Sequence, residues 1–545
     1  MTYISPLPLT LKGLVNNVIR YSRNLERSLS KKRRLSVRRQ SVKVLLVYPA
    51  NQLMSIETPR PDGSLGPLYL ASALESAGYE TDVLDASVGT KENSLEETFY
   101  RSEVQANGLI RIGMNKDQLA SEIARGGYDV VGISSNFTPQ TRLALEVAEA
   151  AKIVSRDILV IAGGVNARNL PTPFFRSGNV DAICLSEGER VVVRLIQAWQ
   201  IGIDLAEVPG VITERGGLTV CCPVDPNDID LDLDRLPFPA WHKLPFQHYD
   251  KISSPHGVIS NGHDRYAPIM TSRGCPFRCK YCHISVEKSQ PITFGNIGSL
   301  RLKSIDRVFA EIDRLKNLGV SKIYFEDDSL LAKKDRVRRI FSQIKHKGLK
   351  IADVNGVNLV HFLKTVSGGS HVIDVEYLEL LADAGFDQIV FPVESASQRI
   401  LNKYATGKLN HEHLDVVELV KTASKIGITC PVNIMIGFPD ETEEEIRKSI
   451  ELGRCLVLAG AAYCTFFIPI PFPGSQLYEI ALKGGHIDPS FDPDLLNWKN
   501  AVMRNTTVSP ERVLELRDWG WRHANTDDHV RMRLETSIGS RWSGG

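Results

Sequence analysis

Hydrophobic positions along the chain alternate between two kinds of segment. Short runs rich in β-branched residues, such as VKVLLVY at 42–48 and ILVIAGG at 158–164, predict buried strands, and the amphipathic stretches between them predict helices. Strands and helices that alternate in this way predict a parallel sheet wrapped by helices. The first such series covers residues 42–203. Its strands are predicted at 42–48, 81–85, 129–134, 158–164 and 181–189, and its helices at 68–77, at 139–154 and from 189 to Trp199.

A second alternating series follows a segment of poor periodicity. Residues 204–265 are rich in Pro and Asp, and we expect them to form a linker. Six strand-helix repeats over 266–480 predict a partial (β/α)6 barrel of the TIM type, and the helical pattern of 481–545 predicts a cap on it. Thr442, followed three residues later by Glu445, predicts a capping box where one barrel helix begins. After APIM at 267–270, the barrel strands are predicted at 322–328, 351–359, 388–395, 429–439 and 463–474, and its helices at 333–347, 411–426 and 443–458.

Charge is distributed unevenly over the 545 residues. The whole chain has 65 basic and 64 acidic side chains, which disfavours a general attraction to nucleic acid. Residues 1–43 alone carry a net charge of +10, so that 1–41 form a basic N-terminal extension. An amphipathic helix through Leu11, Leu14, Val15 and Val18 would suit an anionic membrane surface or a partner, and the alternative is a solvated extension. Apolar runs are too short to cross a bilayer, and we expect a cytoplasmic protein.

Cysteine spacing supplies the clearest candidate chemistry. Nine cysteines are too few for a disulfide framework, and Cys275, Cys279 and Cys282 lie within eight residues. Three thiolates in a loop after the first barrel strand can bind three irons of a 4Fe-4S cluster and leave the fourth iron open. A zinc site that uses His283 as its fourth ligand is the alternative.

This CxxxCxxC segment, with an aromatic residue before its last cysteine, resembles the radical S-adenosylmethionine (SAM) superfamily. The resemblance implies that a reduced cluster cleaves SAM to a 5′-deoxyadenosyl radical. It also implies where SAM binds: two acids after the second strand would contact its amino group, later strand ends would contact its carboxylate or ribose, and a Gly-x-Pro stretch would lie beside adenine. The SAM-binding residues expected in this way are Tyr281, Glu326, Asp327, Asn358, Glu394, Ser395 and Gly437.

Small residues at the strand ends of the first series resemble a second family. Ser134 and Asn136, followed by Gly163 and Gly164, are similar to the serine and double-glycine pattern of flavodoxin-like (Rossmann-type) cobalamin-binding domains. In that family the small side chains admit the nucleotide tail of cobalamin between the strands. The cobalamin-binding residues implied by the resemblance are Ser134, Ser135, Gly163, Gly164, Val165, Ser186, Glu187 and Gly188.

One part of the cobalamin pattern is missing. The family's Asp-x-His-x-x-Gly loop, which supplies a histidine to cobalt, does not follow the first strand, and the first histidine of the chain is His242. We therefore expect no histidine of this domain below the cobalt. The segments 51–54 or 62–66 are predicted to lie there instead, and a sheet that has lost its ligand is the alternative.

The order of these parts over residues 42–480 resembles the cobalamin-dependent (class B) radical SAM enzymes. It implies a methyltransferase that moves a methyl group from methylcobalamin to an unactivated carbon, or phosphorus, of a small-molecule or lipid-like substrate. A flavodoxin or ferredoxin would supply electrons. The alternatives are an oxidative cyclase or ring-rearranging enzyme with a cobalamin domain and, outside enzymes, a corrinoid-binding sensor or carrier. No residue type or spacing identifies the catalytic side chain or the substrate.

Overall fold

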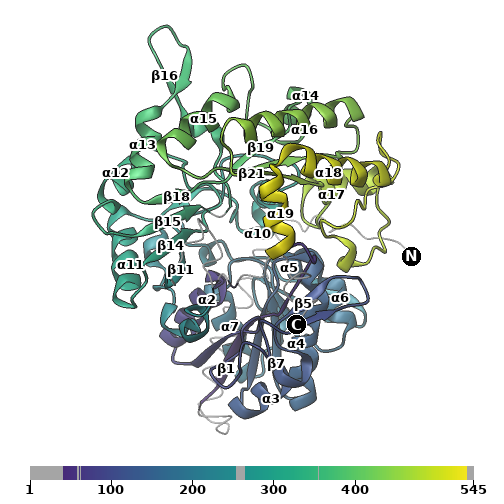
Figure 1. Ribbon diagram of the computed structural model, residues 1–545. Coiled ribbons are helices and arrows are strands. Elements are labelled where there is room, and N and C mark those ends of the chain that lie inside the picture. The colour runs from purple at the N-terminus through teal and green to yellow at the C-terminus, as the bar shows by residue number, and fades with distance from the viewer. Residues whose placement is uncertain (1–40, 58–60, 62, 253–263, 354, 537–545) are drawn as a thin grey trace.

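The N-terminal half is built around one seven-stranded sheet (Figure 1). The computed structural model describes residues 41–57, 61, 63–252, 264–353 and 355–536, so the proposed helix of the basic extension lies outside the described residues. The strand order is β10-β9-β8-β7-β6-β1-β3, and the five strands from β8 to β3 run parallel. These strands are β1 (Lys43–Tyr48), β3 (Glu80–Asp85), β6 (Val130–Ser134), β7 (Leu159–Gly163) and β8 (Ala182–Cys184).

Helices cover both faces of this sheet, as the continuous hydrophobic runs of its strands require. Side chains alternate along β1: Val44 and Leu46 pack with α2 and α7, while Leu45 and Val47 pack with α3 and α4. A helix layer on each face confirms the doubly covered sheet that the sequence predicts. The helices are α2 (Leu65–Ser76), α3 (Lys116–Gly126), α4 (Thr141–Val154), α5 (Val165–Asn169), α6 (Pro171–Arg176) and α7 (Gly188–Gln200).

Two features of this half do not follow from its periodicity. A small antiparallel sheet in the order β2-β5-β4 is built from β2 (Asn51–Leu53), β4 (Ser102–Val104) and β5 (Ile110–Ile112). Residues 204–265, predicted to be only a linker, also contain β9 (Val211–Arg215) and β10 (Leu218–Cys221), which extend the large sheet. β9 and β10 are short strands that form an antiparallel hairpin at the edge of the large sheet. Exposed faces weaken the hydrophobic pattern of strands in this position.

The other described residues of 204–252 connect the two halves and pack against both. The Trp241 indole is buried and donates a hydrogen bond to the carbonyl of Pro268 in the first barrel strand, at 2.9 Å. The neighbouring Ala240 amide donates to the Leu68 carbonyl of α2, at 3.1 Å. The chain here forms short helical turns: η2 (Leu205–Glu207), η3 (Pro226–Asp228), η4 (Leu233–Arg235), η5 (Trp241–Lys243) and α8 (Phe246–Tyr249).

The second half is a barrel of parallel strands that is divided in two. The order β11-β14-β15-β18 forms one sheet and β19-β20-β21 the other, with a single bridge between Gln388 and Thr429. The predicted strand 388–395 is interrupted because the Val390 amide donates to the Asp353 carboxylate and not to a neighbouring strand. The strands are β11 (Tyr266–Ile269), β14 (Lys322–Phe325), β15 (Lys350–Asp353), β18 (Phe386–Gln388), β19 (Phe391–Glu394), β20 (Pro431–Met435) and β21 (Tyr463–Phe467).

Helices follow the barrel strands and lie outside them (Figure 1). The predicted capping box is confirmed: the Thr442 hydroxyl accepts from the Glu445 amide, and the Glu445 carboxylate accepts from the Thr442 amide. Two short pairs, β12 (Ser272–Arg273) with β13 (Arg301–Leu302) and β16 (Leu363–Thr365) with β17 (His371–Ile373), lie outside the barrel sheets. The helices are α9 (His283–Ser289), α10 (Pro291–Phe294), α11 (Ile305–Asn317), α12 (Lys334–Ile344), η6 (Leu359–Phe362), α13 (Val375–Asp383), α14 (Gln398–Tyr404), α15 (Val416–Ile426), α16 (Glu443–Leu458) and α17 (Gln476–Lys483).

The C-terminal cap closes the end of the barrel sheet at β21. It contains η7 (Pro493–Leu495), α18 (Pro510–Ala524) and α19 (Asp527–Thr536), and α18 packs against α16 and β21. Between its two longer helices, the Asn525 side chain accepts from the Cys464 amide at 2.7 Å and donates to the Cys464 carbonyl at 2.8 Å. Asn525 thus makes the two hydrogen bonds with the edge strand β21 that a neighbouring strand would make. Nowhere in the described ranges does a helix have the length and hydropathy of a membrane span.

Replacing Asn525 with Ala should loosen the edge of β21. The substitution leaves a buried amide and a buried carbonyl without hydrogen-bond partners. Each unpaired group should lower the free energy of unfolding by about 1–3 kcal/mol. We expect a lower melting temperature and faster hydrogen exchange at the Cys464 amide. Asn402→Ala, in which an exposed helix asparagine is removed, should leave both unchanged. Equal exchange at β21 in the two variants would contradict this role.

Candidate cobalamin and radical SAM site

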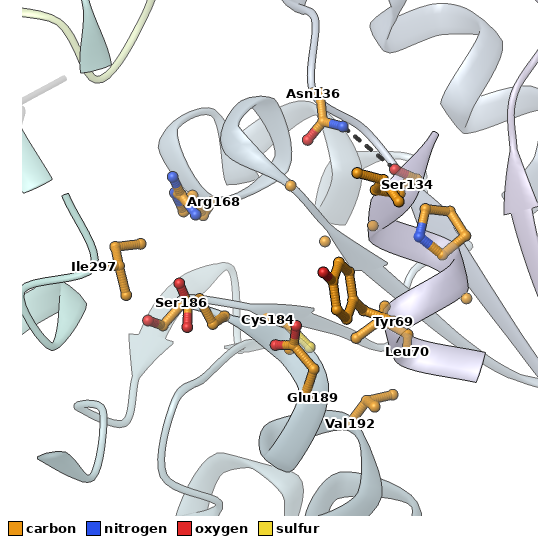
Figure 2. Close-up of a pocket in the computed structure, with 18 of the residues that line it drawn as sticks. Tyr69, Leu70, Ser134, Asn136, Arg168, Cys184, Ser186, Glu189, Val192 and Ile297 are labelled. Atoms are coloured by element: carbon orange, nitrogen blue, oxygen red, sulfur yellow. Dashed lines mark hydrogen bonds between the residues drawn. The ribbon is translucent and has the colours of Figure 1, made fainter. Parts of the chain in front are cut away.

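A cavity of about 300 Å³ opens where the carboxyl ends of β6, β7 and β8 meet the barrel (Figure 2). Ligands of parallel α/β sheets bind at this edge. The side chains of Tyr69 and Leu70 from α2 lie on one side of it, and Arg168 and Ser186 lie on the other. The barrel contributes Met270, Arg273, Gly274, His283, Ile284, Glu287, Ile297 and Asp328 to the lining.

Six of the eight predicted cobalamin-binding residues line this cavity: Ser134, Gly163, Gly164, Ser186, Glu187 and Gly188. The other two lie behind the lining. The Ser135 carbonyl accepts hydrogen bonds from the Asn166 and Ala167 amides, and its side chain is buried. The Val165 amide points to the Asn136 carboxamide at 3.4 Å. Ser135 and Val165 therefore shape the loop around the cavity.

The two glycines at the end of β7 serve different purposes. A Cβ on Gly163 would lie 3.8 Å from its nearest neighbour, the Cβ of Cys184, so the missing side chain leaves free space at the cavity wall. Gly164 has φ +100°, and a Cβ there would lie 2.4 Å from the Ser135 carbonyl. Backbone geometry alone thus requires Gly164, whereas Gly163 fits a cavity that must admit a bulky ligand. Because Gly163 leaves this space free, the residues at the cavity wall fit cobalamin.

The segments predicted to lie below the cobalt have separate positions. Residues 51–53 form β2, and Asn51 lines a smaller neighbouring cavity. Leu65 and Gly66, at the start of α2, line the main cavity together with Pro67. Of the histidines in the described ranges, the one that lines the main cavity is His283 of the barrel. The absence of a histidine from the sheet's own loops agrees with the sequence.

The three cysteines lie in the loop between β12 and α9, and the acids after β14 hold this loop in place. The buried Asp327 carboxylate accepts hydrogen bonds from the Thr271 amide and hydroxyl and from the Ser272 hydroxyl, at 2.6–3.0 Å. The Asp328 carboxylate accepts from the Gly274 amide at 2.8 Å. These bonds occupy Asp327, so the structure favours a structural role for it. Glu326, the other predicted acid, is half-buried after the end of β14.

The three thiols are buried beside two lysines. Burial raises the pKa of all three cysteines, that of Cys282 to about 12, so metal or positive charge is needed to hold thiolates there. Lys408 lowers the pKa of Cys275 and Cys279 by its charge, and Lys288 donates to the Cys275 carbonyl at 2.7 Å. In the part of the chain that is described, no three Cys, His, Asp or Glu side chains could hold a single metal ion. A 4Fe-4S cluster does not require three side chains to meet at one ion, because each thiolate binds its own iron.

Three predicted SAM residues meet beside the cluster loop. The Tyr281 hydroxyl donates to the Glu394 carboxylate at 2.8 Å, and Lys408 donates to the same oxygen at 2.5 Å. Glu394 has φ +67°, a strained conformation that non-glycine residues adopt mostly at functional sites. Ser395 follows it and is fully buried, with its hydroxyl 3.3 Å from that of Ser449.

The remaining predicted SAM residues lie at other strand ends. The Gly437 amide donates to the Glu441 carboxylate at 2.7 Å, and burial raises the pKa of Glu441 to about 8. Asn358 caps η6 through its side-chain oxygen, and its buried nitrogen has no hydrogen-bond partner within the described residues. An orphaned amide donor suits an acceptor on a ligand, such as a carboxylate or a ribose hydroxyl. Apart from Asp327, whose carboxylate is occupied by the cysteine loop, the predicted residues fit SAM.

Ion pairs across the cavity are the feature that sequence reasoning missed. Arg273 pairs with Glu187 at 3.2 Å and with Glu189 at 2.6 Å, so it joins the two halves. Arg168 pairs in the same way with Glu287 of α9. Each pair joins residues at least 84 positions apart, a distance over which a single sequence carries no pairing signal.

Comparison with known families agrees with this geometry. Residues 63–196 match the B12 binding domain, and residues 269–453 match the radical SAM superfamily. A B12-binding domain that precedes a radical SAM domain defines the cobalamin-dependent radical SAM enzymes. The chain belongs to this class, whose cofactors are a 4Fe-4S cluster, SAM and cobalamin.

Individual relatives cover most of the chain. Cytidylyl-2-hydroxyethylphosphonate methyltransferase from Streptomyces wedmorensis is 27% identical over 85% of each chain. Anaerobic magnesium-protoporphyrin IX monomethyl ester cyclase from Rubrivivax gelatinosus is 23% identical over 82% of this chain and 71% of the cyclase. The radical SAM methyltransferase TsrM from Kitasatospora setae, solved with cobalamin and a [4Fe-4S] cluster, has a TM-score of 0.60 at 18% identity over 90% of this chain and 86% of TsrM. This likeness shows the same fold.

Replacing Cys275, Cys279 and Cys282 together with Ala should abolish the cluster. The anaerobically reconstituted wild type should bind about four irons per chain, and the triple variant none. Iron and sulfide analysis with electron paramagnetic resonance (EPR) of the reduced protein provides the measurement. Cys455→Ala removes an exposed thiol on α16 and should keep full iron content. A triple variant that retained its cluster would refute the assignment of these ligands.

Gly163→Trp should block cobalamin while sparing the cluster. The indole would fill the space at the cavity wall that Gly163 leaves open. Equilibrium dialysis should therefore show loss of cobalamin uptake with unchanged iron content. Thr219→Trp, on the exposed edge strand β10, is the matched control and should bind cobalamin normally. Equal cobalamin uptake by the two variants would show that the nucleotide tail lies elsewhere.

Proposed function

We propose that the protein is a methyltransferase that transfers a methyl group from cobalt to an unactivated carbon, or phosphorus, of a small-molecule or lipid-like substrate. When bound, SAM and the cluster supply the 5′-deoxyadenosyl radical that activates such an atom, and cobalamin supplies the methyl group. The observation that carries the proposal is a shared cavity. Gly274, His283 and Asp328 from the cluster side line the same cavity as Ser134 and Gly163 from the cobalamin sheet.

The arrangement of the chain's own residues supports transfer between the two cofactors. Asp327 and Asp328 fix the cysteine loop, and Arg273 fixes that loop against Glu187 and Glu189 of the sheet. Reacting groups held at fixed positions lose less entropy in the transition state, which is a large part of catalysis when a radical must meet a methyl donor. The half-buried cleft also limits water and competing hydrogen donors around the radical.

Relatives point to methyl transfer as the reaction. The Streptomyces relative is named as a phosphonate methyltransferase, and a second relative, 23% identical, is the hopanoid C-3 methylase of Methylococcus capsulatus. Their substrates differ in size and polarity, so substrate choice depends on parts of the barrel and cap that vary between them. The similarity to the anaerobic cyclase makes oxidative ring closure the second candidate function.

Two partners complete the proposal. Reduction of the cluster requires an electron donor of the flavodoxin or ferredoxin kind. The basic residues 1–43 would bring the enzyme to an anionic surface, which would suit a lipid-like substrate.

Turnover with CD3-labelled SAM should give a product that carries all three deuterons, together with S-adenosylhomocysteine and 5′-deoxyadenosine. Mass spectrometry of extracts that contain or lack the protein detects the labelled product whatever the substrate is. Both nucleoside products are expected because one SAM supplies the methyl group and another the radical. A cyclised or oxidised product without label would favour the cyclase.

Enzyme preloaded with CD3-cobalamin and given unlabelled SAM should deliver deuterium to the product in its first turnover. Cobalt is the immediate methyl donor in the proposed reaction, so the label must appear before any methyl group from SAM. Quenched single-turnover samples, analysed by mass spectrometry, provide the measurement. A first product without deuterium would refute transfer from cobalt.

A further inference from the structure

His283 directly follows the last cluster cysteine, yet it faces the cobalamin cavity. His283 lines this cavity, and none of the three cysteines does. On the other side of the same cavity lie Ser134, Gly163 and Gly188 of the sheet. The imidazole is half-buried, with 35% of its side chain exposed. His283 is thus placed between the cluster loop and the strand ends that bind cobalamin.

A buried carboxylate orients the His283 ring. The imidazole Nδ1 lies 2.9 Å from the Glu287 carboxylate, one helical turn further along α9. Arg168 pairs with the same carboxylate, and both of these side chains are less than 10% exposed. The Arg168 guanidinium balances the charge of the Glu287 carboxylate through this ion pair. Asp328, which also lines the cavity, is another titratable group close enough to His283 to interact with its charge.

The orientation determines which nitrogen is available. A carboxylate can only accept a hydrogen bond, so Nδ1 is the donor to Glu287 and Nε2 is the nitrogen left to bind a metal. Nε2 has no hydrogen-bond partner among the residues that the structure describes. A histidine whose one nitrogen donates to a carboxylate while the other is free is the usual arrangement of a histidine that binds a metal.

We propose that Nε2 of His283 is an axial ligand of cobalt, bound from the barrel side in the resting enzyme. The sheet supplies no histidine to cobalt, and His283 is the one histidine that the described structure places in its cavity. The step is ligand exchange alone: the lone pair of Nε2 forms a bond to cobalt and a water molecule leaves, without oxidation or reduction.

Arg168 connects this ligand to the cobalamin-binding loop. It lies on α5, four residues after Gly164, and its ion pair with Glu287 reaches from that loop to α9. Glu287 and Arg168 are therefore positioning residues in this proposal. They hold His283 at the cavity only when the two halves of the protein are correctly packed.

EPR of the cob(II)alamin-loaded protein tests the proposal directly. One ligating ¹⁴N splits each cobalt line into three, and one ¹⁵N splits it into two. The full-length protein should show triplets when grown normally and doublets when its histidines are ¹⁵N-labelled, because the labelled atom then belongs to the protein. His283→Ala and His283→Gln should lose the splitting but retain the reduced cluster signal. Glu287→Gln should weaken the splitting, and His242→Ala, an exposed histidine of the linker, should keep it.

Three results would overturn the assignment. Triplets that persist in the labelled protein would identify the nitrogen as that of the cobalamin base. Spectra without nitrogen splitting would show that no imidazole binds cobalt. A His283 variant whose iron content or cluster signal changes while the cobalt spectrum does not would make the residue an iron ligand. Failure of the wild type to take up cobalamin would instead contradict the cofactor assignment itself, so the two failures are distinguishable.

Discussion

The site depends on buried ion pairs that hold two independently built α/β halves at one cavity. Arg273, in the strand before the cysteine loop, lies between Glu187 and Glu189 at the end of the large sheet, and Arg301 also pairs with Glu187. Removing one partner from a buried pair costs about 3–5 kcal/mol, because the other charge stays buried and uncompensated. Such pairs tolerate little change of angle or distance. They therefore specify one relative position of the halves more strictly than apolar packing would.

The barrel adds a second constraint at the cysteine loop. The cysteine loop lies outside the barrel sheets, and its start is held by side chains that follow another strand. Asp327 and Asp328 do this by accepting hydrogen bonds from Thr271, Ser272 and Gly274. Both acids follow β14, which is paired with β11 immediately before the loop. The strand pairing thereby sets the height of the cysteines relative to the sheet.

The last barrel strand carries a surface that can change without disturbing either cofactor site. Along β21, Cys464 and Phe466 face the helix side, where a Cβ on Gly453 would touch both. The alternating residues Tyr463 and Phe467 are half-buried on the other face, and Phe467 contacts Trp498 of the cap. The cap is thus in contact with the inward face of the last strand.

Much of this protein follows from its sequence alone. Period-two and continuous apolar runs predict most strands, and the Thr442 capping box predicts where a helix begins. The class and its cofactors are implied by the family resemblance that the cysteine spacing, Ser134 and Gly163 carry. These features are local, since each depends on residues a few positions apart or on one strand end. Tertiary structure alone decided three others: the edge strands β9 and β10, the role of Asp327 as an anchor, and the orientation of His283 by Glu287 and Arg168. The physical reason is that each depends on groups brought together from distant parts of the chain, and a carboxylate in a sequence does not show which partner it will have when buried.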